Sequence, residues 1–357
     1  MIYYGIVIFI YLGALVEGFF EGRKKPIVLV LYFLFVVLGI TFIGAGRYNV
    51  GSDFASYKTL YDNVDDLGPY FLEPGYLFVS KAFTYLNYPA LIAFMFLLTI
   101  SLKAGFFLKN APYLFIPLMC YIPIQFMVYD INGIRQGLAI SILFCSIPFI
   151  LDRSLFKFLL ICGLAMSFHI TAIIFIPIYW FATWNLSPQR IAFSLLGLVV
   201  FAFLSQKFLA GFLESYGGAF SLLVKMQSYS KNEAYNKVLS FNLSTFYRIA
   251  ILFAFMSLKK TMKITEEYYK LLQNGYFLSL IVYFFFFGVE LIATRGSLYF
   301  RVLDVIMFSY MATGIKDRFL RQVFIFLIFV YTMLQVFVNL SIEDNELIPY
   351  HHILFNL

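Results

Sequence analysis

The stretch PIVLVLYFLFVVLGITFI at Pro26–Ile43 is almost entirely apolar and contains no charged residue. A helix needs about 20 mainly apolar residues to cross the hydrocarbon core of a bilayer, so this stretch predicts a transmembrane helix. The rest of the 357-residue chain is similar: 62% of its residues are hydrophobic, 13% are charged and the mean hydropathy is +0.85. Soluble domains are about 25% charged, so this composition excludes a soluble globular protein.

Further apolar stretches predict about twelve transmembrane helices, some of them short or re-entrant, in one all-α polytopic membrane domain over residues 1–357. The predicted spans are 2–20, 26–43, 89–107, 112–129, 134–151, 156–168, 170–184, 191–206, 244–258, 275–290, 299–315 and 322–339. Two longer segments between them, 44–88 and 207–243, are predicted outer loops. Apolar residues at helical spacing in the first loop predict an amphipathic helix over Ser52–Asn63.

Clusters of lysine and arginine set the predicted orientation, because cytoplasmic loops carry an excess of both residues. The first span is followed directly by Arg23–Lys25, which we expect in the cytoplasm, with both chain termini outside. If residues 156–184 form two short helices that turn near His169, Lys259–Lys263 and Lys316–Arg321 are cytoplasmic as well. The net charge of +7 is therefore assigned to orientation and to anionic ligands, and nucleic acid is not expected as a partner.

Five arginines fall on the predicted outer side or in the outer part of a span, where the charge rule disfavours them. They are Arg47, Arg135, Arg248, Arg295 and Arg301. Charge inside or on the wrong side of a membrane is costly and usually has a partner or a function. A guanidinium can bind two phosphate oxygens at once, which a lysine cannot. We therefore expect these arginines to have a partner or a function, with an anion as one candidate ligand.

Two short segments contain several polar residues. Gly46-Arg47-Tyr48-Asn49-Val50-Gly51-Ser52-Asp53 combines a guanidinium with a carboxylate. It is either a phosphate-binding and catalytic segment, or a structural one in which Asp53 caps the next helix and Arg47 reaches the lipid interface. Asn132-Gly133-Ile134-Arg135-Gln136-Gly137 begins a predicted span at the outer face, where the helix dipole favours an anion. Arg135 and Gln136 are thus candidate substrate ligands; contact of Arg135 with lipid phosphate is the alternative.

His169 lies in the apolar turn Ser167-Phe168-His169-Ile170-Thr171. A lone histidine is often only a packing residue, but ionisable groups at membrane depth are costly and imidazole titrates near neutral pH. His169 is therefore a candidate functional residue beside Asp53. No second metal ligand lies at suitable spacing near His169, and the three cysteines show no CxxC spacing. Neither a metal nor a cofactor is expected.

Two pairs of residues near the C-terminus have simple structural interpretations. Arg301 and Asp304 are three residues apart and can form a pair on one helix face. His351 and His352 lie in what we expect to be a frayed terminus.

Four motifs follow one another in a fixed order. They are R-x-x-V-G-x-D-x-x-x-Y at Arg47–Tyr57, E-P-G-Y at Glu73–Tyr76, I-R-Q-G-L-A at Ile134–Ala139 and F-H-x-T-A at Phe168–Ala172. In this order and spacing they resemble the EpsG family, Wzy-type polymerases of bacterial polysaccharide repeat units. Tyr247-Arg248, Phe300-Arg301 and Pro349-Tyr350 fall where similar proteins carry related features. Through the motifs, Tyr57 and Glu73 join the candidate substrate-binding residues.

The resemblance implies a GT-C-like glycosyltransferase of the bacterial cytoplasmic membrane with its active site on the outer face. Such enzymes transfer a glycan from one undecaprenyl pyrophosphate carrier to the sugar of another, without a nucleotide sugar or a metal. The outer arginines would then stabilise the leaving pyrophosphate. The acceptor hydroxyl benefits from a general base, for which Asp53 and His169 are the two candidates, and the sequence does not choose between them. The product is an O-antigen, a capsule or an exopolysaccharide. The partners are then the lipid-linked donor and acceptor, membrane lipid and, as a further candidate, a chain-length regulator.

Three other functions stay open at this point. A flippase or transporter of lipid-linked oligosaccharides is expected to show inverted repeats or a charged central path, and neither is visible in the sequence. An O-antigen-ligase-like enzyme shares the chemistry but uses another acceptor, and a non-enzymatic assembly subunit does not need the outer arginines. If neither Asp53 nor His169 is the base, Glu73 or Glu290 is the next candidate.

Overall fold

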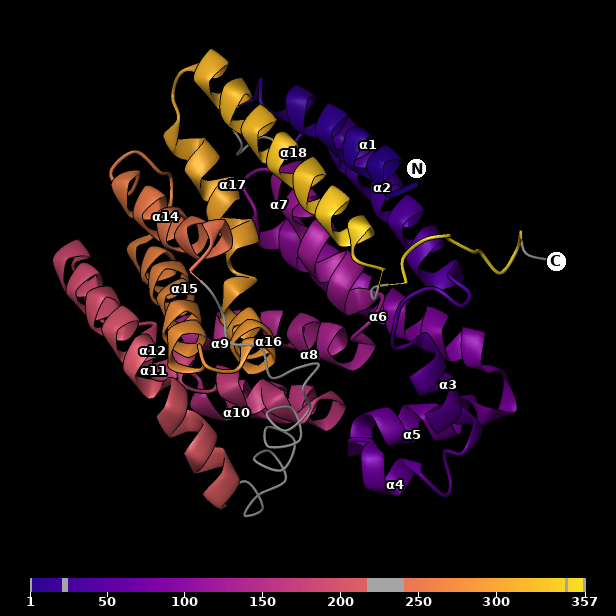
Figure 1. The fold of residues 1–357 in the computed structure, drawn as a ribbon. Coiled ribbons are helices and arrows are strands. Elements are labelled where there is room, and N and C mark those ends of the chain that lie inside the picture. The colour runs from indigo at the N-terminus through magenta and orange to yellow at the C-terminus, as the bar shows by residue number, and fades with distance from the viewer. Residues whose placement is uncertain (1, 21–24, 217–240, 344–345, 356–357) are drawn as a thin grey trace.

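The computed structural model describes residues 2–20, 25–216, 241–343 and 346–355. The regular elements in this part of the chain are helices, which confirms the predicted all-α class (Figure 1). They are α1 (Ile2–Glu17), α2 (Ile27–Gly46), α3 (Phe54–Asp62), α4 (Gly68–Phe71), α5 (Pro74–Ala82), η1 (Phe83–Tyr85), α6 (Tyr88–Asn110), α7 (Phe115–Tyr121), η2 (Ile122–Asp130), α8 (Ile134–Phe144), α9 (Ile147–Leu151), α10 (Leu155–Phe168), η3 (Ile170–Phe175), α11 (Ile178–Phe181), α12 (Pro188–Tyr216), α14 (Leu243–Ser257), α15 (Glu266–Phe285), α16 (Glu290–Arg301), α17 (Asp304–Gly314) and α18 (Arg318–Ser341).

Three of the described helices, α2, α6 and α18, are long and apolar enough to cross a membrane. In α2 the apolar side chains cover every side, so that Phe33 and Ile40 are buried while Phe35 and Leu38 are exposed. A helix that is apolar all round belongs inside a protein or in lipid, and the exposed side of α2 therefore fits contact with lipid. Other predicted spans correspond to apolar helices of 10–17 residues, and the number of about twelve spans stays a prediction.

Several predicted spans are interrupted in the structure. The span predicted at 112–129 is a short α7 that continues as the π-helix η2, and the span at 134–151 is α8 followed by α9. Proline stands in the first turn of both η2 and α9, and proline cannot continue the hydrogen-bond ladder of a preceding helix. The span at 299–315 is divided between α16 and α17. Hydropathy does not register such changes of helix type or such breaks, so the predicted spans did not show where they occur; spans that are short or re-entrant were among those predicted.

The predicted break near His169 is confirmed. α10 ends at Phe168 and the 3₁₀-helix η3 begins at Ile170. His169 itself has an extended backbone, with φ −155° and ψ 111°, so it lies between two helices and belongs to neither. The second half of the pair consists of η3 and the short α11, where one helix over 170–184 was expected.

The long helix α6 runs between two opposite ends of the molecule. At one end the Lys25 ammonium donates to the Leu108 carbonyl oxygen at 2.7 Å, beside the last turn of α6. At the other end of α6 the Tyr88 hydroxyl donates to the Phe54 carbonyl oxygen at 3.0 Å. Tyr88 and Leu108 are 20 residues apart on α6, so the two contacts are separated by roughly 30 Å at 1.5 Å per residue.

We call the Lys25 end the lysine end, because Lys25, Lys109 and Lys263 line one cavity there. We call the opposite end, which contains Arg47 and Arg135, the arginine end. The predicted grouping of Lys259–Lys263 with Arg23–Lys25 agrees with the shared cavity, although residues 21–24 lie outside the described residues.

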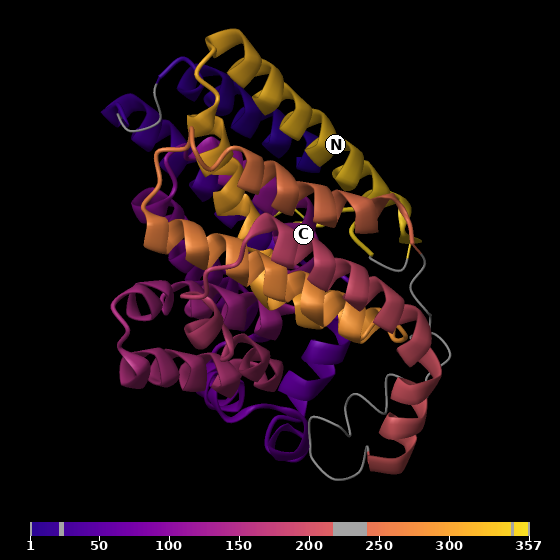
Figure 2. The ribbon, with the colours of Figure 1, turned by 90° about the vertical axis from the view of Figure 1, so that its left-hand side faces the viewer.

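The predicted outer loop at 44–88 folds into small helices at the arginine end. The amphipathic helix expected over Ser52–Asn63 is confirmed as α3, although it is slightly shorter. Figure 1 shows α3, α4 and α5 grouped beside α8 and α10. The second predicted loop begins differently, because α12 continues to Tyr216; residues 217–240 lie outside the described part. In Figure 2 the last turns of α12 extend beyond the neighbouring helices.

The segment after α18 returns to the end of α2. The Tyr48 N–H donates to the His351 carbonyl oxygen at 3.0 Å, and the Ile353 N–H donates to that of Gly46 at 2.8 Å. The His352 ring stacks on Phe42, with centroids 4.3 Å apart. A frayed terminus was expected here, and this expectation is wrong because the main chain pairs with the outer loop.

Candidate functional site

A carboxylate and a guanidinium from segments 62 residues apart meet at the arginine end. Arg135 Nη1 lies 2.5 Å from Glu73 Oε2 and donates to the Phe71 carbonyl oxygen at 3.3 Å. The side chain of Glu73 is 7% exposed and that of Arg135 is 16% exposed. Since a largely buried charge needs a partner, the pair holds the first turn of α8 against the residue that precedes α5.

Glu73 also faces His169. Its Oε1 lies 3.6 Å from His169 Nδ1 and accepts a hydrogen bond from the Ile170 N–H at 3.4 Å. A carboxylate beside Nδ1 favours the tautomer that carries its proton there, which leaves Nε2 as the basic nitrogen. Glu73 therefore contacts both His169, a predicted base, and Arg135, a predicted phosphate ligand.

The local sequence explains how Glu73 reaches this position. Pro74 follows it in the first turn of α5, where the missing N–H of proline costs little. A Cβ on Gly75 would lie 2.5 Å from Ser167 Oγ and 2.9 Å from the Ser167 carbonyl oxygen. Only glycine allows α5 to approach α10 so closely, and this approach places Glu73 beside the break at His169.

Two tyrosines contact the guanidinium of Arg135. Its Cζ lies 5.3 Å from the ring centroid of Tyr57 and 5.7 Å from that of Tyr76. The Nε atom donates to the Tyr57 hydroxyl at 3.2 Å. Both tyrosines are buried, so the cation–π contacts are shielded from water and stronger than at a surface. The second terminal nitrogen of the Arg135 guanidinium, Nη2, makes no hydrogen bond within the described residues. This nitrogen is therefore available to a ligand.

Asp53 stands at the N-cap position of α3, but its side chain makes no capping hydrogen bond. The structural interpretation of Asp53 as a helix cap is therefore wrong. Burial raises the pKa of the Asp53 carboxyl, and the positive charges of Arg295 and Arg135 oppose this rise. Asp53 thus lies within electrostatic reach of two of the predicted arginines.

Polar contacts extend the site from α8 and η3 to α16. Gln136 Nε2 donates to the Arg295 carbonyl oxygen at 3.0 Å. The hydroxyls of Thr171 and Tyr299 lie 2.7 Å apart. Tyr299 follows Arg295 by four residues and so shares its face of α16. The predicted ligands Gln136 and Arg295 therefore belong to one connected region with Arg135.

Arg248 and Arg301 are both buried and close enough for their positive charges to oppose each other. Arg301 Nε lies 3.8 Å from Asp304 Oδ2 across the break between α16 and α17, so the predicted pair exists, but not on one helix face. Arg248 donates to Ser297 Oγ at 3.4 Å and lies over the ring of Tyr283. Two guanidinium groups thus share one carboxylate contact among the described residues. The excess positive charge favours an anion.

Arg47 has different surroundings from the other arginines. It is buried, donates to the Gly44 carbonyl oxygen at 2.6 Å and to the Ile131 carbonyl oxygen at 3.1 Å. These contacts connect the end of α2 to the residues before α8. In the described residues the Arg47 guanidinium does not contact the Glu73–Arg135 pair, so its geometry suits positioning of the loop.

A buried ionic cluster next to the site was not predicted. Lys103 Nζ lies 2.7 Å from both carboxylate oxygens of Asp130, and the Tyr121 hydroxyl donates to Asp130 at 2.6 Å. Both charged side chains are at most 1% exposed. A Cβ on Gly137 would lie 2.4 Å from Asp130 Oδ1, so the cluster packs directly against the helix that carries Arg135. One feature of the sequence indicated this cluster. Lys103 is a single lysine inside a predicted apolar span, and a lysine in that position needs a partner.

A cavity of about 480 Å³ borders the site. Glu73 and Ile170, which contact or adjoin His169, lie in its wall together with Tyr70 and Phe71. The two aromatic rings are mostly exposed, and aromatic rings of this kind offer flat apolar surfaces to a ligand. The cavity brings a volume suited to a small ligand next to the Glu73 carboxylate.

The family model of the EpsG family matches residues 30–352, which is nearly the whole chain. The chain belongs to the EpsG family. All four motifs that suggested the resemblance lie within the matched residues, and the resemblance is confirmed. EpsG family members are Wzy-type polymerase-like, so membership indicates a glycosyltransferase-like, polysaccharide polymerase-like role in a membrane. Neither the curated proteins nor the solved structures contain a match.

Proposed function

We propose that this EpsG family protein polymerises polysaccharide repeat units by glycosyl transfer at the outer face of the bacterial cytoplasmic membrane. The donor is an undecaprenyl-pyrophosphate-linked glycan, and the acceptor is a sugar hydroxyl of a second lipid-linked unit. The observation that carries the proposal is the contact of Glu73 with both Arg135 and His169 beside a cavity of about 480 Å³. A base, a phosphate ligand and space for a substrate thus occur together.

In the proposed reaction, His169 Nε2 takes the proton of the acceptor hydroxyl. The hydroxyl oxygen forms a bond to the anomeric carbon of the donor while the bond from that carbon to the pyrophosphate oxygen breaks. Undecaprenyl pyrophosphate leaves with the electron pair. Glu73 Oε1 lies 3.6 Å from Nδ1 and its charge stabilises the imidazolium that forms, as expected for a general base beside a carboxylate.

Arg135 supports the departure of the pyrophosphate. Negative charge builds up on the leaving oxygens, and fixed guanidinium donors stabilise such charge more than water does. Arg135 offers Nη2. The Arg248–Arg301 group offers a positive charge that the one carboxylate contact found in the described part of the chain does not balance. Asp53 lies near Arg295 and Arg135. In this position Asp53 is better suited to hold those two arginines in place than to accept a proton.

The orientation follows from the charges at the two ends. Since lysine-rich ends face the cytoplasm, the cavity with Lys25, Lys109 and Lys263 is assigned to the cytoplasm and the Glu73–Arg135 pair to the outside. Single cysteines at positions 53 and 260, treated with an impermeant maleimide, test this assignment. We expect labelling from outside at position 53 only; labelling at position 260 would overturn the orientation.

The proposed activity is tested with purified protein in vesicles and a defined undecaprenyl-pyrophosphoryl repeat unit. We expect the wild type and His351→Ala to form a ladder of products, and His169→Ala to lose about 10²–10⁴ in rate. His351 is the matched control because it lies at the same end, where only its main chain contacts Tyr48. A deletion strain should accumulate single repeat units on the outer leaflet. Accumulation on the inner leaflet would indicate a flippase, and transfer only to a non-repeat acceptor would indicate a ligase.

A further inference from the structure

The cavity of about 480 Å³ beside Glu73 has one wall on α10, where Gly163, Met166 and Ser167 line it. The other lining residues are 70–74 and Ile170. Among the lining residues that the structure describes, Glu73 is the only charged one, and neither a lysine nor an arginine is included. A buried anion needs cations or several hydrogen-bond donors, so the cavity itself does not suit a pyrophosphate.

The wall of this cavity is also poor in groups that could bind a sugar. The Glu73 carboxylate contacts Arg135 and the Ile170 N–H. The Ser167 hydroxyl donates to the Leu164 carbonyl oxygen at 2.7 Å. Most of the remaining wall is apolar and consists of Phe71, Leu72, Pro74, Gly163, Met166 and Ile170. Since the hydroxyls of a buried sugar need hydrogen-bond partners, the cavity suits an apolar group better than a sugar.

An apolar stripe on α10 continues from the cavity along the helix. Phe156, Leu160 and Leu164 are 74%, 57% and 49% exposed and follow one another at a spacing of four residues. Gly163 and Ser167 lie three residues after Leu160 and Leu164, so all five share one face of the helix. We call Phe156, Leu160, Gly163 and Leu164 the α10 stripe. Exposed apolar side chains on a helix within a predicted span fit contact with lipid, so the cavity lies at the end of a lipid-facing stripe.

Gly163 leaves a gap in the α10 stripe between Leu160 and Leu164. A Cβ at Gly163 would meet no atom within 4 Å, so packing within the described chain does not require a glycine there. Glycine weakens a helix relative to most other residues. A glycine with this cost and without a packing reason fits a position where a ligand needs the space.

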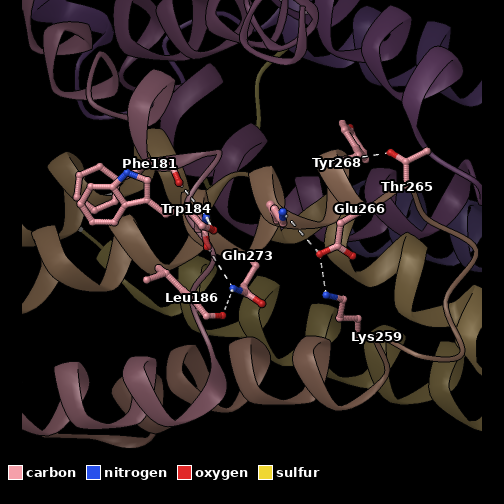
Figure 3. A network of polar contacts seen from close by, with 10 residues as sticks. Phe181, Trp184, Leu186, Lys259, Thr265, Glu266, Tyr268 and Gln273 are labelled. Carbon is pink, nitrogen blue, oxygen red and sulfur yellow. Dashed lines mark hydrogen bonds and ion pairs between the residues drawn. The ribbon is translucent and has the colours of Figure 1, made fainter. Parts of the chain in front are cut away.

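The hairpin formed by α10, η3 and α11 is held on two sides, because α10 packs on α8 and α11 packs on α15. On α15, Asn274 donates to the carbonyl oxygens of Phe181 and Trp184 at 2.8 and 2.9 Å. Figure 3 shows the neighbouring Gln273 directed toward Leu186, to whose carbonyl oxygen it donates at 3.2 Å. These contacts fix the hairpin, so the α10 stripe is a defined surface of the protein.

We propose that the cavity and the α10 stripe bind the polyprenyl chain of the lipid-linked donor, with its first isoprene units in the cavity and the following units along the stripe. This inference rests on the proposed function, in which the pyrophosphate lies at Arg135. Arg135 donates to the Phe71 carbonyl oxygen at 3.3 Å, and Phe71 lines the cavity. A chain that leaves the pyrophosphate can therefore enter the cavity directly.

The chemistry of the wall favours a polyprenyl chain over the acyl chain of a membrane phospholipid. In a polyprenyl pyrophosphate the apolar chain begins at the phosphate oxygen, whereas glycerol and ester groups separate the phosphate from the acyl chains of a phospholipid. On both sides of Glu73 the wall consists of Leu72 and Pro74, which have no side-chain donor for an ester. The methyl branches of an isoprenoid also fill the gap at Gly163 better than a straight chain does.

Photolabelling of the full-length protein in phosphatidylcholine nanodiscs locates the chain. The probe is undecaprenyl pyrophosphate that carries a diazirine on an isoprene unit next to the pyrophosphate and has no sugar. Peptide mapping by mass spectrometry then identifies the labelled residues. We expect labelling within residues 70–74 and 160–167. Excess unlabelled undecaprenyl pyrophosphate should suppress this labelling, and excess phosphatidylglycerol should not.

Gly163→Leu fills the gap in the stripe, and Gly197→Leu is the matched control. Gly197 is an exposed residue of α12 between the exposed Phe193 and Val200, and a Cβ there also meets no atom within 4 Å. Each substitution thus adds the same side chain to an exposed apolar helix surface and favours the helix equally. Both variants should therefore melt at or above the wild-type temperature.

The effect of filling the gap comes from packing. Lipid tails are as apolar as the stripe, so the stripe selects a chain by its shape and not by hydrophobicity. Gly163→Leu should weaken photolabelling about tenfold. It should also raise the donor KM of polymerisation about tenfold with kcat nearly unchanged, because uniform binding is lost. The control should stay within about twofold of the wild type in both measurements.

Labelling outside the cavity wall and the stripe, equal suppression by phosphatidylglycerol, or unchanged labelling and KM in Gly163→Leu would refute the proposal. Polymer formation separates this result from the outcome for the proposed function. Wild-type protein that forms polymer without labelling at the cavity contradicts the cavity assignment alone. Wild-type protein that is labelled there but forms no polymer contradicts the polymerase proposal and leaves the site for the chain in place.

Discussion

Glu73→Gln removes the negative charge that Arg135 and His169 share and keeps the size of the side chain. In the folded protein this carboxylate lies 2.5 Å from Arg135 Nη1 and 3.6 Å from His169 Nδ1, and its side chain is 7% exposed. A glutamine can still hydrogen-bond to Arg135, but it cannot stabilise a positive charge on the imidazole. The substitution therefore acts on the proton transfer more than on the fold.

The size of the effect follows from the distance between the two charges. A carboxylate and an imidazolium about 4 Å apart attract by about 4 kcal/mol at an effective dielectric constant of 20. Arg135 shares the same carboxylate, so part of this attraction is absent. We expect a barrier higher by about 2–3 kcal/mol, which is a rate loss of about 30- to 150-fold.

The assay is the rate of polymer formation in vesicles, together with donor binding and the thermal stability of the purified variant. We expect the rate to fall while donor binding stays close to that of the wild type. Glu267→Gln is the matched control, because Glu267 is an exposed carboxylate in the first turn of α15 at the lysine end. A wild-type rate in correctly folded Glu73→Gln would refute the assignment of Glu73 as the residue that orients His169.

Three further predictions concern neighbouring charges. Arg135→Lys keeps the charge but loses the fork, so polymer should be nearly absent at normal membrane levels; polymer of normal length would indicate that Arg135 contacts lipid phosphate instead. Lys103→Met leaves the buried Asp130 without its cation and should cost about 3–5 kcal/mol, seen as a lower melting temperature that adding Asp130→Leu largely restores. Burial raises the pKa of Asp53, so the folded state binds its proton more tightly than the unfolded state, and stability falls as pH rises from about 4 through the raised pKa. Asp53→Asn should therefore melt higher than the wild type at pH 7 and equally near pH 4; a lower melting temperature at pH 7 would contradict this.

Local features of the structure could be predicted from the sequence. The helical class follows from long apolar stretches, and the break at His169 follows from the number of spans needed to place the lysine clusters at one end. The order of the four motifs identified the family, and three of the residues that meet at the arginine end, Glu73, Arg135 and His169, lie in those motifs. The change to a π-helix at Ile122 and the break before α9 were not predictable in the same way, because an interrupted helix has the same hydropathy as a regular one.

Contacts between distant segments could not be predicted. Glu73 is 62 residues from Arg135, and its contact with His169 depends on how closely α5 packs on α10 at Gly75. The sequence indicates that Lys103 needs a partner. Which residue becomes that partner depends on the packing of α6 against the region of η2, and the structure shows that it is Asp130. Tertiary packing decides such pairs, and a single sequence does not record it.

The arrangement around Glu73 has a consequence for the order of binding in the proposed reaction. Arg135 Nη1 is occupied by Glu73 in the absence of a ligand, so a pyrophosphate that engages the whole fork competes with this carboxylate. As Arg135 turns to the pyrophosphate, Glu73 keeps its contacts at His169 and Ile170. The Glu73 carboxylate is then less neutralised by Arg135, and its charge favours the imidazolium that forms when Nε2 takes a proton. We therefore expect the donor to bind before the acceptor hydroxyl is deprotonated, because binding of the donor draws Arg135 away from Glu73 and so favours proton transfer to His169.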